Sequence, residues 1–107
     1  MKTKIIIADD HKIMREGLKA LIEKQPDMEV AAEAREGLEV TTLARKLAPQ
    51  VIIMDIGMPE MNGIDATRQV LSENKDIKII ALSMHSDRRF VLEMLKAGAS
   101  GYLLKDS

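Results

Sequence analysis

The chain has 107 residues, which is enough for one hydrophobic core and too few for two separate domains. Hydrophobic residues make up 46% and charged residues 31% of the chain, which excludes a disordered protein, and the formal net charge of −1 argues against direct DNA binding. Cysteine is absent and no apolar run is long enough for a signal peptide or a membrane span, so we expect no disulfides and a cytoplasmic location.

The first half of the chain alternates between strand and helix patterns. Residues 5–8 are apolar without alternation, as a strand buried on both faces requires. A helical stripe follows, formed by Met14, Leu18, Leu21 and Ile22. Met28–Ala34 reads as an edge strand with charged glutamates on one side and, on the other, Met28, Val30, Ala32 and Ala34. The next helix ends before Pro49 and carries a stripe of Val40, Leu43, Ala44 and Leu47.

The second half repeats this alternation. The elements expected there are strands at 51–54, 79–82 and Gly101–Leu104, and helices at Gly63–Glu73 and from a capping Asp87 to Gly98. The order βαβαβαβαβ with right-handed crossovers predicts an open, doubly wound α/β domain with a parallel five-stranded sheet between two layers of helices. Periodicity does not determine the order of the strands in that sheet.

Polar residues follow the apolar runs at the point where each strand ends. Asp9 and Asp10 follow the first strand, Asp55 the third, Ser83 the fourth and Lys105 the fifth. Ligands of open parallel sheets bind beyond these ends, so the side chains should face one pocket. A lone aspartate there is more often a helix cap, but five coincidences at one edge favour a functional site. Three clustered carboxylates repel one another unless a cation lies among them, and we expect Mg²⁺ or Mn²⁺, with a phosphoryl group as the further ligand.

Several of these residues also form a familiar pattern. The chain resembles the receiver domains of bacterial two-component response regulators in Asp9-Asp10, in Asp55 followed by Met58-Pro59 and Asn62-Gly63, in Ser83, and in the residues from Gly98 to Lys105. The last block is most similar to receivers that precede a LuxR-type helix-turn-helix output domain. The resemblance implies a flavodoxin-like sheet with the strand order 2-1-3-4-5. It also implies a sensor histidine kinase as partner and control of transcription through DNA binding by an output domain.

The resemblance assigns a chemical role to each pocket residue. It implies that Asp55 is the phosphoacceptor, which attacks a phosphohistidine of the kinase, and that Lys105 contacts a phosphoryl oxygen. Mg²⁺ would be held by Asp10, Asp55 and the backbone carbonyl of Gly57, with Asp9 helping through water. Such a domain catalyses its own phosphorylation and dephosphorylation and is not otherwise an enzyme.

The same resemblance implies that Ser83 and Tyr102 form a switch. Ser83 would move toward the new phosphoryl oxygens and Tyr102 would turn inward, so that the fourth helix and the last strand carry the signal. Considered alone, each residue fits a purely structural role as well as it fits the switch. Tyr102 would then be a half-buried aromatic residue on a strand, and Ser83 a surface hydroxyl in a turn. His85 fits a solvated loop histidine better than a neighbour of the acyl phosphate.

Two features depart from the family pattern. Asp106 follows Lys105 where many receivers have proline, and because a non-proline cis bond costs about 3 kcal/mol, we expect a trans peptide. The chain ends at Ser107, so we expect a receiver spanning residues 1–107, truncated after the fifth strand and without a fifth helix. The apolar surface exposed in this way should favour homodimers or larger assemblies.

Three other functions fit these residues less well. An aspartate-based phosphatase needs a second acid two residues after Asp55, where Gly57 stands. A nucleotide- or flavin-binding protein needs a phosphate loop rich in glycine or serine, and Asp9-Asp10-His11 would repel phosphate. An interaction module that works without phosphorylation stays open, although every group needed for the chemistry is present.

Overall fold

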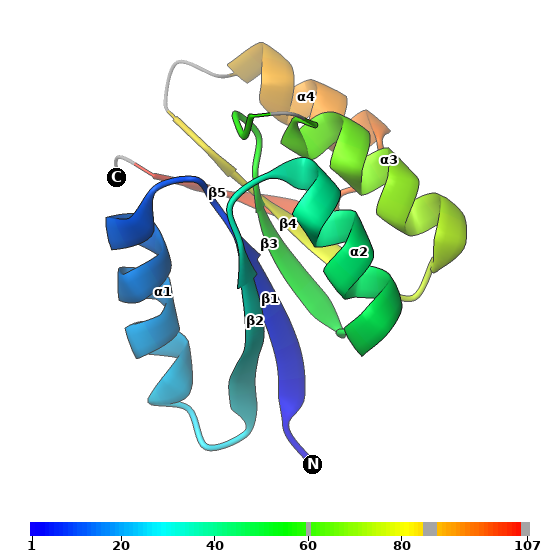
Figure 1. The fold of residues 1–107 in the computed structure, drawn as a ribbon. Coiled ribbons are helices and arrows are strands. Elements are labelled where there is room, and N and C mark those ends of the chain that lie inside the picture. Colours follow the sequence, from blue (N-terminus) through cyan, green and yellow to red (C-terminus); the bar gives the residue numbers. More distant parts are fainter. Residues whose placement is uncertain (60, 85–87, 106–107) are drawn as a thin grey trace.

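Five parallel strands form one sheet in the order β2-β1-β3-β4-β5, which confirms the expected flavodoxin-like fold (Figure 1). The computed structural model describes residues 1–59, 61–84 and 88–105. The strands are β1 (Thr3–Ala8), β2 (Met28–Ala34), β3 (Val51–Asp55), β4 (Lys78–Ser83) and β5 (Gly101–Leu104). The helices in the described residues are α1 (Lys12–Glu23), α2 (Gly37–Leu47), α3 (Gly63–Glu73) and α4 (Arg88–Lys96), and none of them is long and apolar enough to cross a bilayer.

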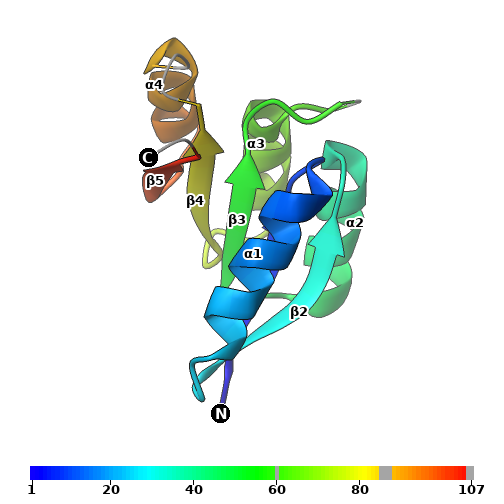
Figure 2. The same ribbon diagram turned by 90° about the vertical axis from the view of Figure 1, so that its left-hand side faces the viewer.

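The helices form two layers on opposite faces of the sheet. α1 lies on one face, where Met14, Leu18 and Ile22 pack against a small apolar cluster of β1, β3 and β4. α2, α3 and α4 cover the other face and enclose the larger core, in which Ile6 and Ile52 are fully buried. Figures 1 and 2 show α1 separated from α2 and α3 by the sheet. This arrangement leaves the carboxyl ends of the strands free to form a site.

β2 is an edge strand as predicted, but its side chains do not keep one alternation. One residue of β2, Ala31, is extra in the pairing with β1, so the register shifts by one position there. An extra residue reverses which side chains face which side of a sheet. Met28 therefore packs beside α1, whereas Ala32 and Ala34 pack in the core beneath the other helices. The prediction that Met28, Val30, Ala32 and Ala34 share one face was wrong.

The apolar stripe of α1 is narrower than predicted. Met14, Leu18 and Ile22 contact the sheet, but Leu21 is 61% exposed and does not belong to the packing surface. The contact follows the row of residues spaced by four along the helix, and Leu21 lies on its flank. No other helix in the described ranges covers that flank.

The expected helix boundaries agree well with the structure. α3 spans Gly63–Glu73 as predicted, and α2 ends at Leu47, with Ala48 in a left-handed conformation before Pro49. Gly98 has a φ of 115°, which suits glycine and stops α4 after Lys96.

The connection between β3 and α3 is tightly packed and holds the end of β3 in place. The Asn62 side chain accepts a hydrogen bond from the Asp65 backbone N–H at 3.0 Å and so caps α3. The Gly63 N–H donates to the Ile56 carbonyl at 2.9 Å. A Cβ atom at Gly63 would overlap the carbonyl oxygen of Asp55, so only glycine allows α3 to begin this close to the strand.

Candidate functional site

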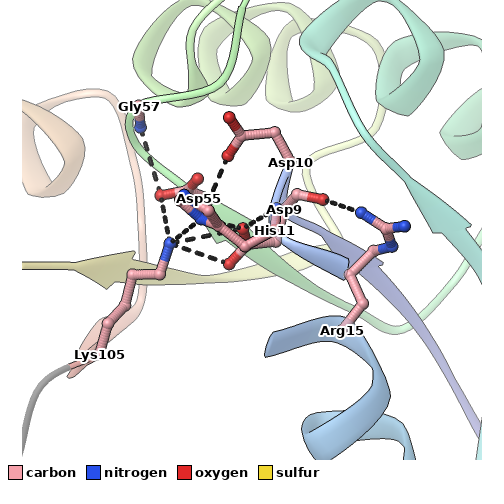
Figure 3. Close-up of polar contacts among 7 residues, drawn as sticks. All are labelled: Asp9, Asp10, His11, Arg15, Asp55, Gly57 and Lys105. Carbon is pink, nitrogen blue, oxygen red and sulfur yellow. Dashed lines mark hydrogen bonds and ion pairs between the residues drawn. The ribbon is translucent and has the colours of Figure 1, made fainter. Parts of the chain in front are cut away.

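The carboxyl ends of β1, β3 and β5 bring Asp9, Asp10, Asp55 and Lys105 together (Figure 3). Lys105 Nζ lies 3.1 Å from Asp9 Oδ2 and 3.5 Å from Asp55 Oδ1. One oxygen from each of the three aspartates and one ring nitrogen of His11 all lie within 4.8 Å of one another. Three carboxylates therefore share one small volume with one ammonium group.

Asp9 is the buried centre of this cluster. Its side chain is fully buried, and Oδ1 accepts a hydrogen bond from the His11 backbone N–H at 2.8 Å. Its backbone carbonyl accepts a hydrogen bond from Arg15 Nη1 at 2.7 Å, and Arg15 Nε donates to Glu33 on β2 at 3.2 Å. Arg15 thus ties the turn that carries Asp9 and Asp10 to the edge strand.

Asp55 lies at the end of β3 and is 5% exposed. Its pKa is raised from 3.8 to about 6, chiefly by burial and then by the charge of Asp9, while Lys105 and a hydrogen bond from the Gly57 N–H act in the opposite direction. That hydrogen bond spans 3.3 Å to Asp55 Oδ1. At neutral pH the carboxylate is therefore ionised and poorly solvated, a state that suits a nucleophile.

Ser83 is the last residue of β4, and Tyr102 lies on the neighbouring strand β5. Ser83 is 1% exposed, and its hydroxyl makes no hydrogen bond to any group in the described part of the chain. Its backbone carbonyl accepts a hydrogen bond from the Lys105 N–H at 2.8 Å, which keeps β4 and the lysine in register. Tyr102 is 52% exposed and lines an open hollow with Arg88 and Val91 of α4.

Two residues of the site were not predicted, namely His11 and Arg15. His11 Nδ1 lies 3.0 Å from both Asp9 Oδ1 and Lys105 Nζ. Their positions in the sequence could have pointed to the site, because His11 directly follows the acidic pair Asp9-Asp10 and Arg15 comes one helical turn later. Three other predictions, on His85, on the Asp87 cap and on the peptide between Lys105 and Asp106, fall outside the described residues.

Residues 5–107 match the sequence profile of the family described as the response regulator receiver domain. The chain belongs to this family. The transcriptional regulatory protein DegU of Brevibacillus brevis is 45% identical to this receiver over 105 residues, which cover 98% of the chain and 44% of DegU. LiaR of Bacillus subtilis (strain 168) is 46% identical over 104 residues, covering 97% of the chain and 49% of LiaR. The receiver thus spans about half the length of these curated relatives.

Solved structures give the same assignment. The crystal structure of a LuxR-family two-component response regulator from Aurantimonas sp. SI85-9A1 is 38% identical, with a TM-score of 0.92 over 100% of this chain and 76% of that one. The expected similarity to receivers of LuxR-type regulators is therefore confirmed. Members of the family are regulators and not conventional enzymes.

Receivers bind Mg²⁺ in an acidic pocket, and the donor atoms of this receiver fit such an ion. Carboxylate oxygens are the ligands that Mg²⁺ prefers, and the pocket carries three carboxylates against one ammonium. Asp9 Oδ2 is buried and accepts no hydrogen bond within the described residues, although Lys105 Nζ is nearby as an ion-pair partner. An added divalent cation would relieve the repulsion between these groups.

Proposed function

We propose that this receiver accepts a phosphoryl group on Asp55 from a phosphohistidine of a sensor histidine kinase, in a reaction that requires Mg²⁺ or Mn²⁺. The observation that carries the proposal is the environment of the Asp55 carboxylate. It is buried, ionised at neutral pH, and lies 3.5 Å from an ammonium group that can move to a phosphoryl oxygen. Phosphoryl transfer depends mainly on positioning and on neutralising charge, and both are available here.

In the proposed step, a carboxylate oxygen of Asp55 forms a bond to phosphorus while the phosphorus–nitrogen bond of the phosphohistidine breaks. Asp10, Asp55 and the carbonyl of Gly57 would hold the metal ion, with Asp9 helping through water. When bound, the ion would supply positive charge that offsets the charge on the carboxylates and on the phosphoryl oxygens. Lys105 turns from the aspartates to a phosphoryl oxygen of the acyl phosphate.

The proposed switch uses Ser83 and Tyr102. The buried Ser83 hydroxyl has no hydrogen-bond partner among the described residues, so a phosphoryl oxygen would supply one. Movement of Ser83 would shift the start of the α4 region, and Tyr102 would turn into the hollow beside Arg88 and Val91. The surface of α4 and β5 would then differ between the two states.

We further propose that these 107 residues are the receiver part of a longer transcriptional regulator that acts in the cytoplasm. The support is that the curated transcriptional regulators that match are about twice as long as the matched region. DNA would be contacted by the output domain of that protein, and two or more copies of the receiver would associate with each other.

Intact-mass measurement after incubation with phosphoramidate tests the acceptor assignment. Wild type should gain one phosphoryl adduct that requires Mg²⁺, and Asp55→Asn should gain none. Asp76→Asn, which changes an exposed aspartate, is the matched control and should behave like wild type. An adduct that persists in Asp55→Asn would contradict the assignment, and a folded wild type without any adduct would favour an interaction module that works without phosphorylation.

A further inference from the structure

The backbone of Asp9 is held from two directions where β1 runs into the turn before α1. Its N–H donates to the carbonyl of Ala34, the last residue of β2, at 2.9 Å. Its carbonyl accepts a hydrogen bond from Arg15 Nη1 at 2.7 Å, and Figure 3 shows this contact on the side of Asp9 away from Lys105. That carbonyl belongs to the peptide group between Asp9 and Asp10, so Arg15 holds the plane from which the Asp10 side chain projects.

The Arg15 side chain is itself anchored on the edge strand. It is 11% exposed, and its Nε donates to Glu33 Oε1 at 3.2 Å. The planar guanidinium presents its N–H groups in a fixed arrangement, so one side chain bonds the turn and the strand at once. Lys19 Nζ also lies 3.8 Å from Glu33, but its side chain is 45% exposed and starts one helical turn further from the pocket. Arg15 is therefore the rigid link between β2 and the turn.

The extra residue in β2 makes Glu33 available for this link. Side chains on a strand alternate between the two faces of the sheet, and an extra residue reverses the alternation beyond it. Met28, before the shift, packs beside α1, whereas Ala32 and Ala34, after it, pack in the core on the opposite face. Glu33 lies between these two alanines and therefore faces α1, where it meets Arg15. In a regular register it would face the other way, and bulges commonly re-aim side chains in this manner beside functional sites.

The stability of α1 does not account for an arginine at this position. Arg15 comes one turn after the N-cap residue His11, and the N-terminus of a helix carries a partial positive charge that disfavours cations. The guanidinium is also largely withdrawn from water, which is unfavourable for a charge unless it is paired and hydrogen-bonded. The contacts that compensate for this are those to the Asp9 carbonyl and to Glu33.

We propose that Arg15 is a positioning residue for the divalent cation site, and that the shifted register of β2 supplies its anchor through Glu33. Because Arg15 holds the peptide between Asp9 and Asp10 in one orientation, the turn is already ordered before a cation enters. Residues that orient metal ligands without touching the ion typically change metal affinity by about 10–100-fold. The inference rests on the proposed function, because it concerns the cation site of the same phosphoryl-transfer reaction.

Positioning by Arg15 and a purely electrostatic effect of its charge predict opposite changes in Mg²⁺ affinity. If only the charge mattered, its removal would make the pocket more negative and Mg²⁺ would bind more tightly. We expect instead that Arg15→Met binds Mg²⁺ about tenfold more weakly than wild type, as measured by NMR titration of the backbone amides with MgCl₂. Lys19→Met removes the other cation paired with Glu33 and leaves the turn untouched, so this matched control should stay within about twofold of wild type.

Further variants test the two ends of the link. Arg15→Lys keeps the charge but has a single donor group in place of the planar fork, so it should bind Mg²⁺ about threefold more weakly. Glu33→Ala should also weaken binding, whereas Glu33→Gln keeps an acceptor oxygen and should stay within about twofold of wild type. The rate at which Arg15→Met gains the phosphoryl adduct from phosphoramidate should be low at low Mg²⁺ and approach the wild-type rate when Mg²⁺ is saturating.

A folded Arg15→Met protein whose Mg²⁺ affinity equals or exceeds that of wild type would overturn the proposal. Urea unfolding in EDTA shows whether each variant is folded, and a loss of stability with unchanged Mg²⁺ affinity would mean that Arg15 has a structural role only. If Arg15→Met does not fold, a wild-type Mg²⁺ affinity in Arg15→Lys would overturn the proposal in the same way. Failure of the proposed function is distinguishable, because it would appear as a wild-type protein that binds Mg²⁺ and gains no adduct on Asp55.

Discussion

Replacing Asp55 with asparagine should make the protein more stable at neutral pH when no metal is present. The raised pKa of Asp55 means that the folded protein disfavours the ionised carboxylate, chiefly because the group is buried and then because Asp9 is nearby. Asparagine has almost the same shape and no charge. The substitution therefore removes an unfavourable charge and leaves the packing of the site unchanged.

The size and the pH dependence of this effect follow from the pKa. The difference between 3.8 and about 6 corresponds to about 3 kcal/mol, at 1.36 kcal/mol per pH unit. Solvent at the open edge of the pocket screens the charge, so we expect about 1–2 kcal/mol, or a rise in Tm of about 5–10 °C. The folded protein binds this proton more tightly than the unfolded chain between about pH 4 and 6, so the stability of wild type falls as the pH rises through that window. The advantage of asparagine is complete above this window and vanishes below it.

Urea unfolding of wild type and Asp55→Asn in EDTA, at several pH values on both sides of that window, measures the effect. The exposed Asp76→Asn variant serves as the control and should show no such pH dependence. Adding Mg²⁺ at ten times its Kd should stabilise wild type by about 1.4 kcal/mol and the Asp55→Asn variant by much less. A variant that is less stable than wild type at neutral pH in EDTA would refute the reasoning, as would a difference that does not change with pH.

Three further substitutions test other parts of the site. Lys105→Met should raise the pKa of Asp55 above about 6, because the ammonium opposes the effect of burial. A carbon-13 NMR titration of the Asp55 carboxyl group in EDTA measures this pKa, and an unchanged value would contradict the prediction. Ser83→Ala should raise the free energy of unfolding by about 1–3 kcal/mol, since the buried hydroxyl lacks a partner among the described residues, and a clear loss of stability in urea would contradict this. Gly63→Ala should destabilise the protein by about 2–3 kcal/mol in the same assay, because its Cβ would overlap the Asp55 carbonyl oxygen. Gly17→Ala, where nothing lies within 4 Å of the added Cβ, is its matched control and should stabilise α1 by about 0.5–1 kcal/mol.

The sequence was sufficient to predict that the pocket residues would meet, because topology alone determines their place. Asp9, Asp55 and Lys105 each follow an apolar run, and the carboxyl ends of parallel strands lie at one edge of a sheet. The separation of Asp9 and Lys105 by 96 positions in the sequence therefore presented no obstacle. Strand order was a different matter, since it depends on packing between elements and came only from the family resemblance.

The features that the sequence did not predict correctly are those that depend on local geometry. The extra residue in β2 is Ala31, and two adjacent alanines give no sign of which strand position is doubled. Leu21 has the spacing of a packing residue, but exposure depends on what covers the flank of α1. The direction of the His11 side chain depends on the extended backbone of the N-cap, with φ of −95° and ψ of 110°, and on the hydrogen bond between its N–H and Asp9.

The unfavourable features of the site lie where the proposed phosphoryl group would act. Burial of the Asp55 charge costs about 1–2 kcal/mol after screening, and a buried hydroxyl without a partner, as at Ser83, costs about 1–3 kcal/mol. Both costs would be relieved in a phosphorylated, metal-bound state, which gives a combined bias of about 2–5 kcal/mol. A change from a 1:99 to a 99:1 population needs about 5.5 kcal/mol. Relief of these two costs would thus supply a large part of the free energy for a conformational switch, and contacts made by Lys105 and the metal ion would have to supply the rest.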